Sequence, residues 1–220
     1  MSLPILSPLQ ARIVAVLVEK AATVPDTYPM SLNSLVSGCN QKTARDPVMN
    51  VSEAEVLVEL DQLKTLNLVF QQSGNRVARY EHNMGRVLAV PGAAVALLAT
   101  LMLRGPQTSA ELRTHCERLH KFADISSVDG FLEELAEKSP PRVVKLARAP
   151  GAREPRWAHL LCGEVSMAVW DDSTSAAVAA AQGIDLGEIV AMRSELARQA
   201  GEIAELRAQV QRLNSELGLT

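Results

Sequence analysis

The sequence has few aromatic residues and few cysteines. Aromatic side chains make up 3% of the 220 residues, and the tryptophans and tyrosines lie far apart. Rings so dispersed form a poor stacking platform for single-stranded nucleic acid, and packing explains each of them better. The three cysteines, Cys39, Cys116 and Cys162, form no C-x-x-C or Cys/His motif. This pattern argues against a zinc site or a disulfide framework, and we expect a reducing cytoplasm as the compartment.

Signals for export or membrane insertion are also lacking. The N-terminal residues have neither the basic region nor the continuous apolar core of a signal peptide. The longest uncharged stretch, residues 87–103, is interrupted by Pro91-Gly92. Its remaining apolar run is shorter than the roughly 20 residues that a bilayer requires. We therefore predict that it forms the buried first helix of a second domain, with no membrane contact.

Motifs of catalysis and cofactor binding are missing as well. The chain has no glycine-rich phosphate loop, no paired metal-ligand motif and no nucleophile elbow. None of the four histidines, His82, His115, His120 and His159, stands beside a serine or cysteine nucleophile in a recognisable turn. Surface or packing roles explain them better. We expect a protein that is not an enzyme and that needs neither a metal nor another cofactor.

One pattern occurs twice in the chain. An apolar helix, a short polar helix and a second amphipathic helix precede two short strands, which are joined by a turn that contains arginine. The first copy begins at Ser7 and ends in a hairpin at residues 69–80, where Gly74-Asn75 suits a tight reversal. The second begins at Gly92 and ends in strands at 143–146 and 157–160. This order is the outline of a winged helix.

The predicted fold class is therefore mainly α with small β-hairpins, an α+β arrangement of two tandem winged-helix domains. We place these domains at residues 1–88 and 89–161, followed by a linker at 162–183 and a C-terminal helix at 184–220. In that helix hydrophobic residues recur with a seven-residue period, interrupted by Gln199. The hypothesis is a coiled coil that makes a homodimer, the alternative being a lone helix folded back on the same chain. The predicted contact residues are Ile189, Met192, Leu196, Ile203, Leu206, Val210, Leu213 and Leu217.

Charge is distributed unevenly along the chain. The net charge is −3, but the second hairpin is basic, since Arg142, Lys145, Arg148, Arg153 and Arg156 face only Glu154. Such a wing could lie along a phosphate backbone, and a solvated basic hairpin explains the pattern equally well. The helices that precede the hairpins, residues 52–64 and 126–138, are acidic. Their carboxylates suit the helix dipole but oppose insertion into a DNA groove.

The segment between the second and third helices of the first copy is long for a helix-turn-helix. Its polar residues Asn40, Gln41, Lys42, Thr43 and Arg45 suit contacts with bases, phosphates or an acidic protein. The alternative is a structural loop whose Asn and Gln side chains bond their own backbone.

Several blocks of the sequence resemble the bacterial YceH family. The blocks are 28–36, 39–43, 45–49, 74–77, 103–108 and 144–148, followed by Pro150-Gly151 and Arg153-Glu154. They occur in the expected order and span roughly residues 5–161. The resemblance implies a tandem winged-helix fold in a cytoplasmic bacterial protein. It implies no biochemical activity and supplies no catalytic residues.

Two hypotheses of function follow. The first is a dimeric protein that associates with double-stranded DNA through its wings, for example as a transcriptional regulator. Its candidate DNA contacts are Lys42, Arg45, Arg76, Arg79, Lys145, Arg148, Arg153 and Arg156. The second is a protein-protein interaction module or scaffold that binds no nucleic acid. Five or more cations aligned on one face would favour DNA, whereas dispersed cations would favour a protein partner.

Overall fold

The N-terminal helices begin at side-chain caps that the sequence supplies. The computed structural model describes residues 5–72, 77–148 and 154–165. Helix α1 (Pro8–Thr23) begins after Ser7, which forms a capping box with Gln10. Helix α2 (Leu32–Cys39) begins after the capping residue Ser31. Helix α3 (Glu53–Thr65) begins at the predicted capping box of Ser52 and Glu55, which is confirmed.

A small antiparallel sheet completes this half. Strand β1 (Met30–Ser31) follows the short 3-10 helix η1 (Pro25–Thr27), and β2 (Val69–Gln72) and β3 (Arg79–His82) form the hairpin. The strand order is β1-β3-β2. In this register Tyr80 pairs with both Met30 of β1 and Gln71 of β2. The sheet therefore holds the hairpin against the segment that leads into α2.

The C-terminal half repeats this order of elements. After the short α4 (Met84–Leu88) come α5 (Gly92–Arg104), α6 (Ser109–Cys116) and α7 (Ile125–Glu137), and then the antiparallel strands β4 (Val143–Lys145) and β5 (Trp157–His159). An isolated bridge joins Gln107 to Trp157. This bridge corresponds to the pairing of β1 with β3 in the first half.

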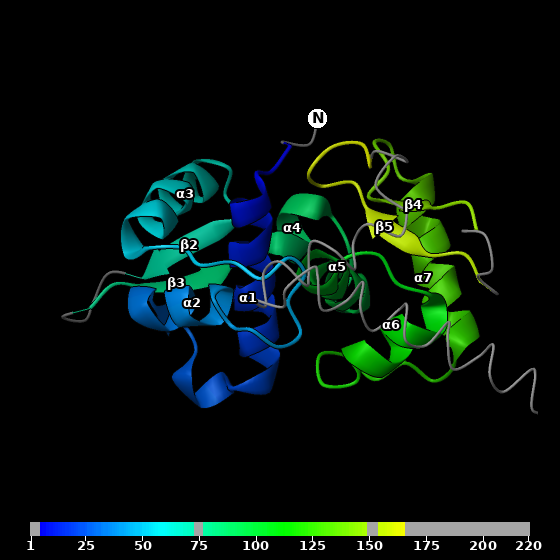
Figure 1. The fold of residues 1–220 in the computed structure, drawn as a ribbon, viewed down its shortest axis with the longest axis horizontal. Helices are drawn as coiled ribbons and strands as arrows, with labels where there is room; N and C mark the ends of the chain where they lie inside the picture. Colours follow the sequence, from blue (N-terminus) through cyan, green and yellow to red (C-terminus); the bar gives the residue numbers. More distant parts are fainter. Residues whose placement is uncertain (1–4, 73–76, 149–153, 166–220) are drawn as a thin grey trace, which may run out of the picture. The chain divides into compact units, whose positions relative to one another are not determined.

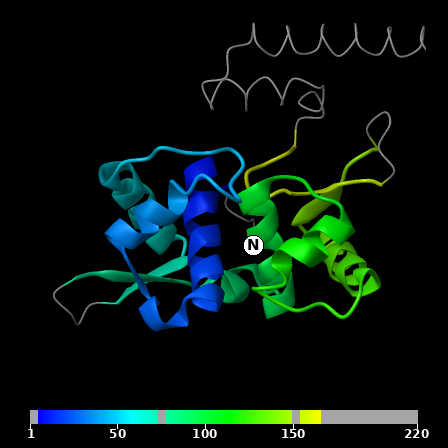
Figure 2. The same ribbon diagram turned by 60° about the horizontal axis from the view of Figure 1, so that its bottom comes forward.

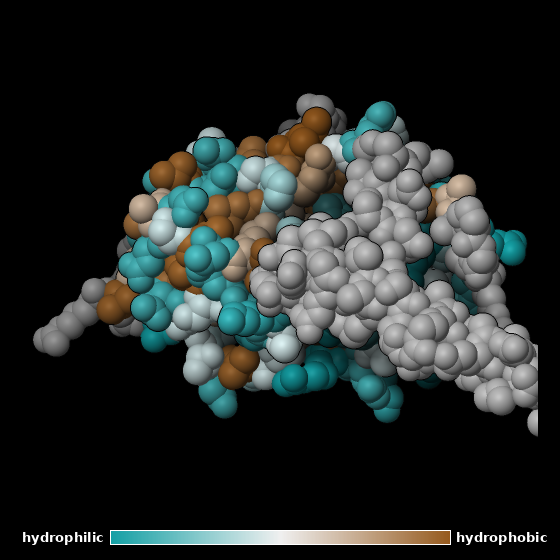
Figure 3. Space-filling model, viewed as in Figure 1, coloured by the Kyte–Doolittle hydropathy of each residue, from teal (hydrophilic) through white to brown (hydrophobic). Residues whose placement is uncertain are grey.

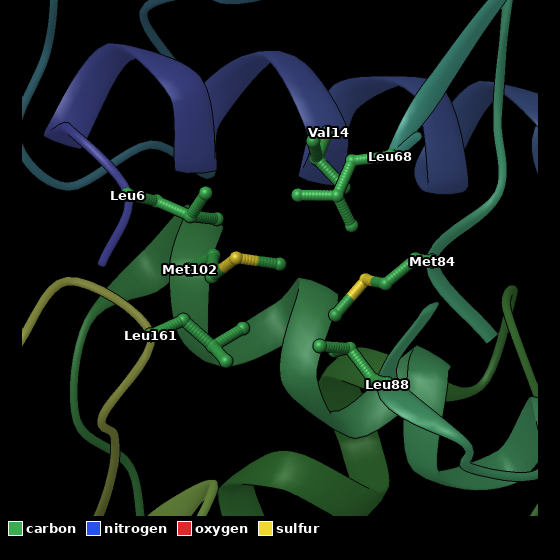
Figure 4. A pocket seen from close by; sticks show the side chains of 7 residues that line it. All are labelled: Leu6, Val14, Leu68, Met84, Leu88, Met102 and Leu161. Carbon is green, nitrogen blue, oxygen red and sulfur yellow. The ribbon is translucent and has the colours of Figure 1, made fainter. Parts of the chain in front are cut away.

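The two halves pack together through α1 and α5, which lie side by side in both views (Figures 1 and 2). The hydrophobic core runs through both halves, and residues 1–165 form one compact unit. A small gap of about 10 Å³ at this junction is lined by apolar side chains (Figure 4). It holds at most about one water and offers that water few polar partners, so it is a packing gap. Its walls are Leu6, Val14, Leu68, Met84, Leu88, Met102 and Leu161.

The coarse predictions agree with this architecture. Helices combine with small antiparallel sheets, as the α+β class requires. Helix α5 is buried from Ala93 to Leu103, which confirms that the uncharged stretch is a core helix. No helix in the described part of the chain is both long and apolar enough to cross a membrane. The predicted boundary at 88/89 falls between α4 and α5, while most of the predicted linker and the entire C-terminal helix, with its coiled-coil contact residues, lie outside the described residues.

Candidate macromolecule-binding surface

Arg45, a predicted phosphate contact, lies inside the protein. Its side chain has 0% of its area exposed, and its Nη2 lies 2.6 Å from Oε2 of Glu19 on α1. Its Nη1 donates to Oε1 of the same carboxylate over 3.2 Å, and its Nε donates to the Gly38 carbonyl. This two-pronged ion pair fastens the loop after α2 to α1. The guanidinium therefore has no exposed surface with which to meet DNA.

A second buried arginine, Arg12, holds the same loop. Only 1% of Arg12 is exposed, and its guanidinium donates to the carbonyls of Cys39 (3.2 Å) and Pro47 (2.7 Å). Its Nε has no hydrogen-bond partner among the described residues. Burial lowers the pKa of Arg12, and the nearby charge of Arg45 lowers it further. Arg12 was not among the predicted site residues, although a lone cation inside the apolar run of α1 is a visible signal in the sequence.

The polar residues of this loop mostly bond their own backbone. Asn40 donates to the Val51 carbonyl and accepts from the Val51 amide, both over 2.8 Å. Gln41 donates to the Thr43 carbonyl over 3.0 Å. These contacts match the structural-loop alternative. Lys42, by contrast, is exposed.

The basic residues of the second hairpin have different surroundings. Arg142 is buried and donates to the Pro140 carbonyl. Arg156 pairs with Glu111 of α6 at 3.2 Å and donates to the Pro106 carbonyl over 2.8 Å. Lys145 and Arg148 are exposed, and the Lys145 ammonium lies 5.2 Å from the centre of the Trp157 ring. Arg153 lies outside the described residues.

In the first hairpin Arg79 is half-buried and donates to the Pro29 carbonyl over 2.7 Å, and Arg76 lies outside the described residues. The candidates that the structure leaves exposed are thus Lys42, Lys145 and Arg148. Lys42 follows α2 in the first half, whereas the other two belong to the second hairpin. The predicted contacts that are exposed among the described residues are therefore fewer than the five aligned cations that would favour DNA.

Helix α3 presents a different surface. Its core-facing residues are Val56, Leu60 and Leu63, but Leu57 and Val58 point away from the core, with 41% and 60% of their areas exposed. Figure 3 shows hydrophobic side chains among hydrophilic ones on the surface of this half. From the sequence, only the core stripe of α3 was predicted. The two hydrophobic residues outside that stripe, Leu57 and Val58, were a visible signal of a second surface.

Carboxylates accompany these residues and recur on α7. On α3, Glu53, Glu55 and Asp61 are exposed, and Lys64 pairs with Asp61 at 2.7 Å. The exposed residues of α7 include three glutamates, Glu133, Glu134 and Glu137. The helices that precede the hairpins thus present negative charge in both halves, as their sequences predicted.

The histidines show no catalytic arrangement in the part of the chain that the structure describes. Burial lowers the pKa of His82, of His115 and, to about 4, of His159. Neutral imidazoles of this kind suit packing. His115 meets Gln107 through Nδ1. Within residues 5–72, 77–148 and 154–165, no three His, Cys, Asp or Glu side chains are grouped to hold a metal ion.

The family described as "Protein of unknown function, DUF480" matches residues 6–152. The chain belongs to this family. A UPF0502 protein of Leptothrix cholodnii is 66% identical over 214 residues, which cover 97% of this chain and 96% of the relative. UPF0502 proteins of Burkholderia orbicola and Burkholderia cenocepacia are 60% and 59% identical, covering 97% of this chain and 90% of each relative. The motifs thus correctly indicated an uncharacterised bacterial family.

The DUF480 match extends from the start of α1 past β4. It includes the Arg12 and Arg45 contacts, the outward face of α3 and the acidic face of α7. Both arginines and the exposed residues of α3 therefore belong to the part of the chain that defines the family match.

Proposed function

We propose that this chain is a non-enzymatic binding protein built from two winged-helix units, and that its main partner is a protein. The winged-helix assignment is supported by the order α1, β1, α2, α3, β2, β3 and by the sheet order β1-β3-β2. The repeated order in the second half, with the Gln107 bridge in place of a first strand, supports it again. We also infer that this family is the YceH family that the motifs resemble.

The observation that carries the proposal is the outward face of α3. A winged helix that reads DNA inserts the helix before its hairpin into the major groove, where cations and amides meet phosphates and bases. Here that helix presents Leu57 and Val58 among carboxylates. Its negative charge would repel the phosphate backbone, and its hydrophobic side chains suit a protein interface.

Binding of double-stranded DNA is the second candidate, and the exposed pair Lys145 and Arg148 favours it. In that case the second wing would contact the phosphate backbone, and the role would be that of a DNA-associated protein such as a transcriptional regulator. Each cation that contacts a phosphate adds about 0.9 to the slope of log affinity against log salt.

Fluorescence anisotropy with a random-sequence duplex across a salt series separates the two candidates. The full chain is compared with a Lys145→Ala, Arg148→Ala variant and with an Arg156→Ala control, which removes a cation already paired with Glu111. We expect no salt-dependent binding by any of the three. Binding that weakens steeply with salt, with a slope that falls by about 2 in the double variant and less in the control, would overturn the proposal in favour of DNA.

The protein partner is tested by affinity capture with the full chain from an extract of the source bacterium, with and without nuclease. We expect specific protein bands that persist after nuclease treatment. Bands that disappear with nuclease would indicate a nucleic-acid bridge and would contradict a direct protein partner.

A further inference from the structure

The exposed hydrophobic residues of α3 form one continuous patch. Residues three and four apart on a helix are neighbours on its surface. Ala54 therefore lies one turn before Leu57 and Val58, and Asp61 lies one turn after both. With Glu53 and Glu55 at the N-terminal end, these six residues are all exposed, and we call them the α3 surface.

The position of the α3 surface is fixed by the core beneath it. Val56, Leu60 and Leu63 on the opposite side of the helix are at most 1% exposed, so the helix cannot roll to bury Leu57 or Val58 without exposing them. The N-terminus of α3 is held by the Ser52 capping box. A hydrophobic patch on a fixed helix marks an interaction site more strongly than single exposed residues on loops do.

The charge of α3 specifies the partner. The helix carries four carboxylates, Glu53, Glu55, Glu59 and Asp61, and one cation, Lys64. Hydrogen bonds from the Ser52 hydroxyl and amide lower the pKa of Glu55, which favours its charged form. Glu59, at the flank of the helix, accepts hydrogen bonds from Ser7 and Gln10 of the neighbouring α1 segment, which hold its carboxylate in place. A surface with a hydrophobic centre and a negative rim complements a segment with a hydrophobic anchor and a positive rim.

We propose that the α3 surface docks a basic amphipathic helix of a partner protein, with hydrophobic side chains over Leu57 and Val58 and lysine or arginine beside Glu53, Glu55 and Asp61. This inference rests on the proposed protein-binding function and names the chemistry of the partner. Ala54 is small, so it allows the backbone of a docked helix to approach closely. Hydrophobic residues on one face of the docked helix would recur every three or four positions.

Helix α7 provides an internal comparison. Its carboxylates Glu133, Glu134 and Glu137 are exposed like those of α3. Its largest exposed hydrophobic residue, Ile125 with 44% exposed, is the first residue of the helix, and Phe131 packs against Phe122 with 5.9 Å between ring centres. The equivalent helix thus has the negative charge without a hydrophobic pair in its centre. Charge alone would direct a basic helix to both helices, whereas the proposed docking requires α3.

The test uses two synthetic helical peptides of the same length with leucine on one face. One peptide has lysine on its flanks and the other has glutamate. Binding to the full chain is measured by fluorescence anisotropy at physiological salt, and the contact is mapped by amide chemical shifts. The variants are Leu57→Ser, Val58→Ser on α3 and the matched control Ile125→Ser on α7, each checked for folding by circular dichroism.

We expect the lysine peptide to bind the unmodified chain and the Ile125 variant equally. It should bind the Leu57, Val58 variant at least about tenfold more weakly, because the hydrophobic anchor is lost. The glutamate peptide should not bind, and the shifted amides should lie at residues 53–61. Equal binding of the lysine peptide to both variants, or shifts centred on α7, would overturn the inference.

A second variant separates charge from the hydrophobic anchor. Glu53→Gln, Glu55→Gln and Asp61→Asn together keep the shape of the α3 surface but remove its charge. We expect this variant to bind the lysine peptide more weakly and with a shallower dependence on salt. An unchanged affinity and salt dependence would show that these carboxylates do not select a basic partner.

The failure of this inference is distinguishable from that of the proposed function. If the Leu57, Val58 variant captures the same nuclease-resistant protein bands as the unmodified chain, the protein-binding function stands and docking at α3 is wrong. If the chain captures no protein and binds duplex DNA through the second wing, both proposals fall.

Discussion

The buried ion pair of Glu19 and Arg45 should contribute strongly to stability, and Glu19→Gln tests this. The Arg45 side chain is 0% exposed and that of Glu19 is 16% exposed. Removal of one partner of a buried pair typically costs about 3–5 kcal/mol, because the other charge stays buried without compensation. Arg45 would keep its bonds to the carbonyls of Gly38 and Ala44. We therefore expect the low end of that range, about 3 kcal/mol of unfolding free energy.

Lys20→Gln is the matched control because Lys20 contacts the same carboxylate. Its ammonium lies 3.2 Å from Oε2 of Glu19, and its side chain is 23% exposed. Loss of such a partly solvated contact should cost about 1 kcal/mol or less. Urea unfolding of the full chain, followed by circular dichroism, measures both variants. In thermal unfolding a loss of about 3 kcal/mol corresponds to roughly 6–12 °C in a protein of this size.

Acid should reduce the difference in unfolding free energy between the unmodified chain and the Glu19→Gln variant. Burial alone would raise the pKa of Glu19, but the hydrogen bonds and charge of Arg45, together with Lys20, lower it below its ordinary value of 4.5. A carboxyl whose pKa is lowered by folding stabilises the protein above pH 4.5, and this contribution disappears as the pH falls through the folded-state pKa. If Glu19→Gln at pH 7 destabilises the protein no more than Lys20→Gln does, the reasoning about the buried pair is refuted.

Two further predictions concern described residues, and a third tests the C-terminal helix that the sequence predicts. Gly38→Ala should destabilise the protein by about 1–3 kcal/mol in urea unfolding, because the new Cβ would lie 2.6 Å from a methyl group of α1; Gly92→Ala, which meets open space, is the control, and equal losses would contradict this account. The thiols of Cys39 and Cys116, whose pKa values burial raises to about 12 and about 11, should react with a thiol reagent only on unfolding. Rapid labelling of either of these two residues in the native chain, as distinct from the partly exposed Cys162, would contradict their burial. A chain that ends at Gly183 should sediment as a monomer if the C-terminal helix makes the predicted homodimer, and an unchanged assembly mass would eliminate that helix as the contact.

The local features of this fold were predictable from the sequence. The capping box at Ser52 and the burial of α5 depend on residues close together in the chain, and both were predicted correctly. The surroundings of the cations depend on distant residues. Arg45 meets Glu19 across 26 positions, and Arg156 meets Glu111 across 45. A list of basic residues cannot reveal such partners, so the predicted DNA contacts included side chains that the fold engages internally.

The two buried arginines, Arg12 and Arg45, help to position the α3 surface. Arg45 fastens the middle of the loop to α1 through Glu19, and Arg12 holds the nearby Pro47 carbonyl. Asn40 then bonds both backbone groups of Val51, directly before the Ser52 cap of α3. Each contact fixes one point of the path from α2 to α3. Arg45 and Asn40, which suggested a ligand contact in the sequence, therefore position the helix that carries Leu57 and Val58.

These loop contacts are internal, so Glu19→Gln should weaken peptide docking at α3 only as far as it lowers the stability of the fold. The Leu57→Ser, Val58→Ser variant should instead weaken docking in a chain that remains folded.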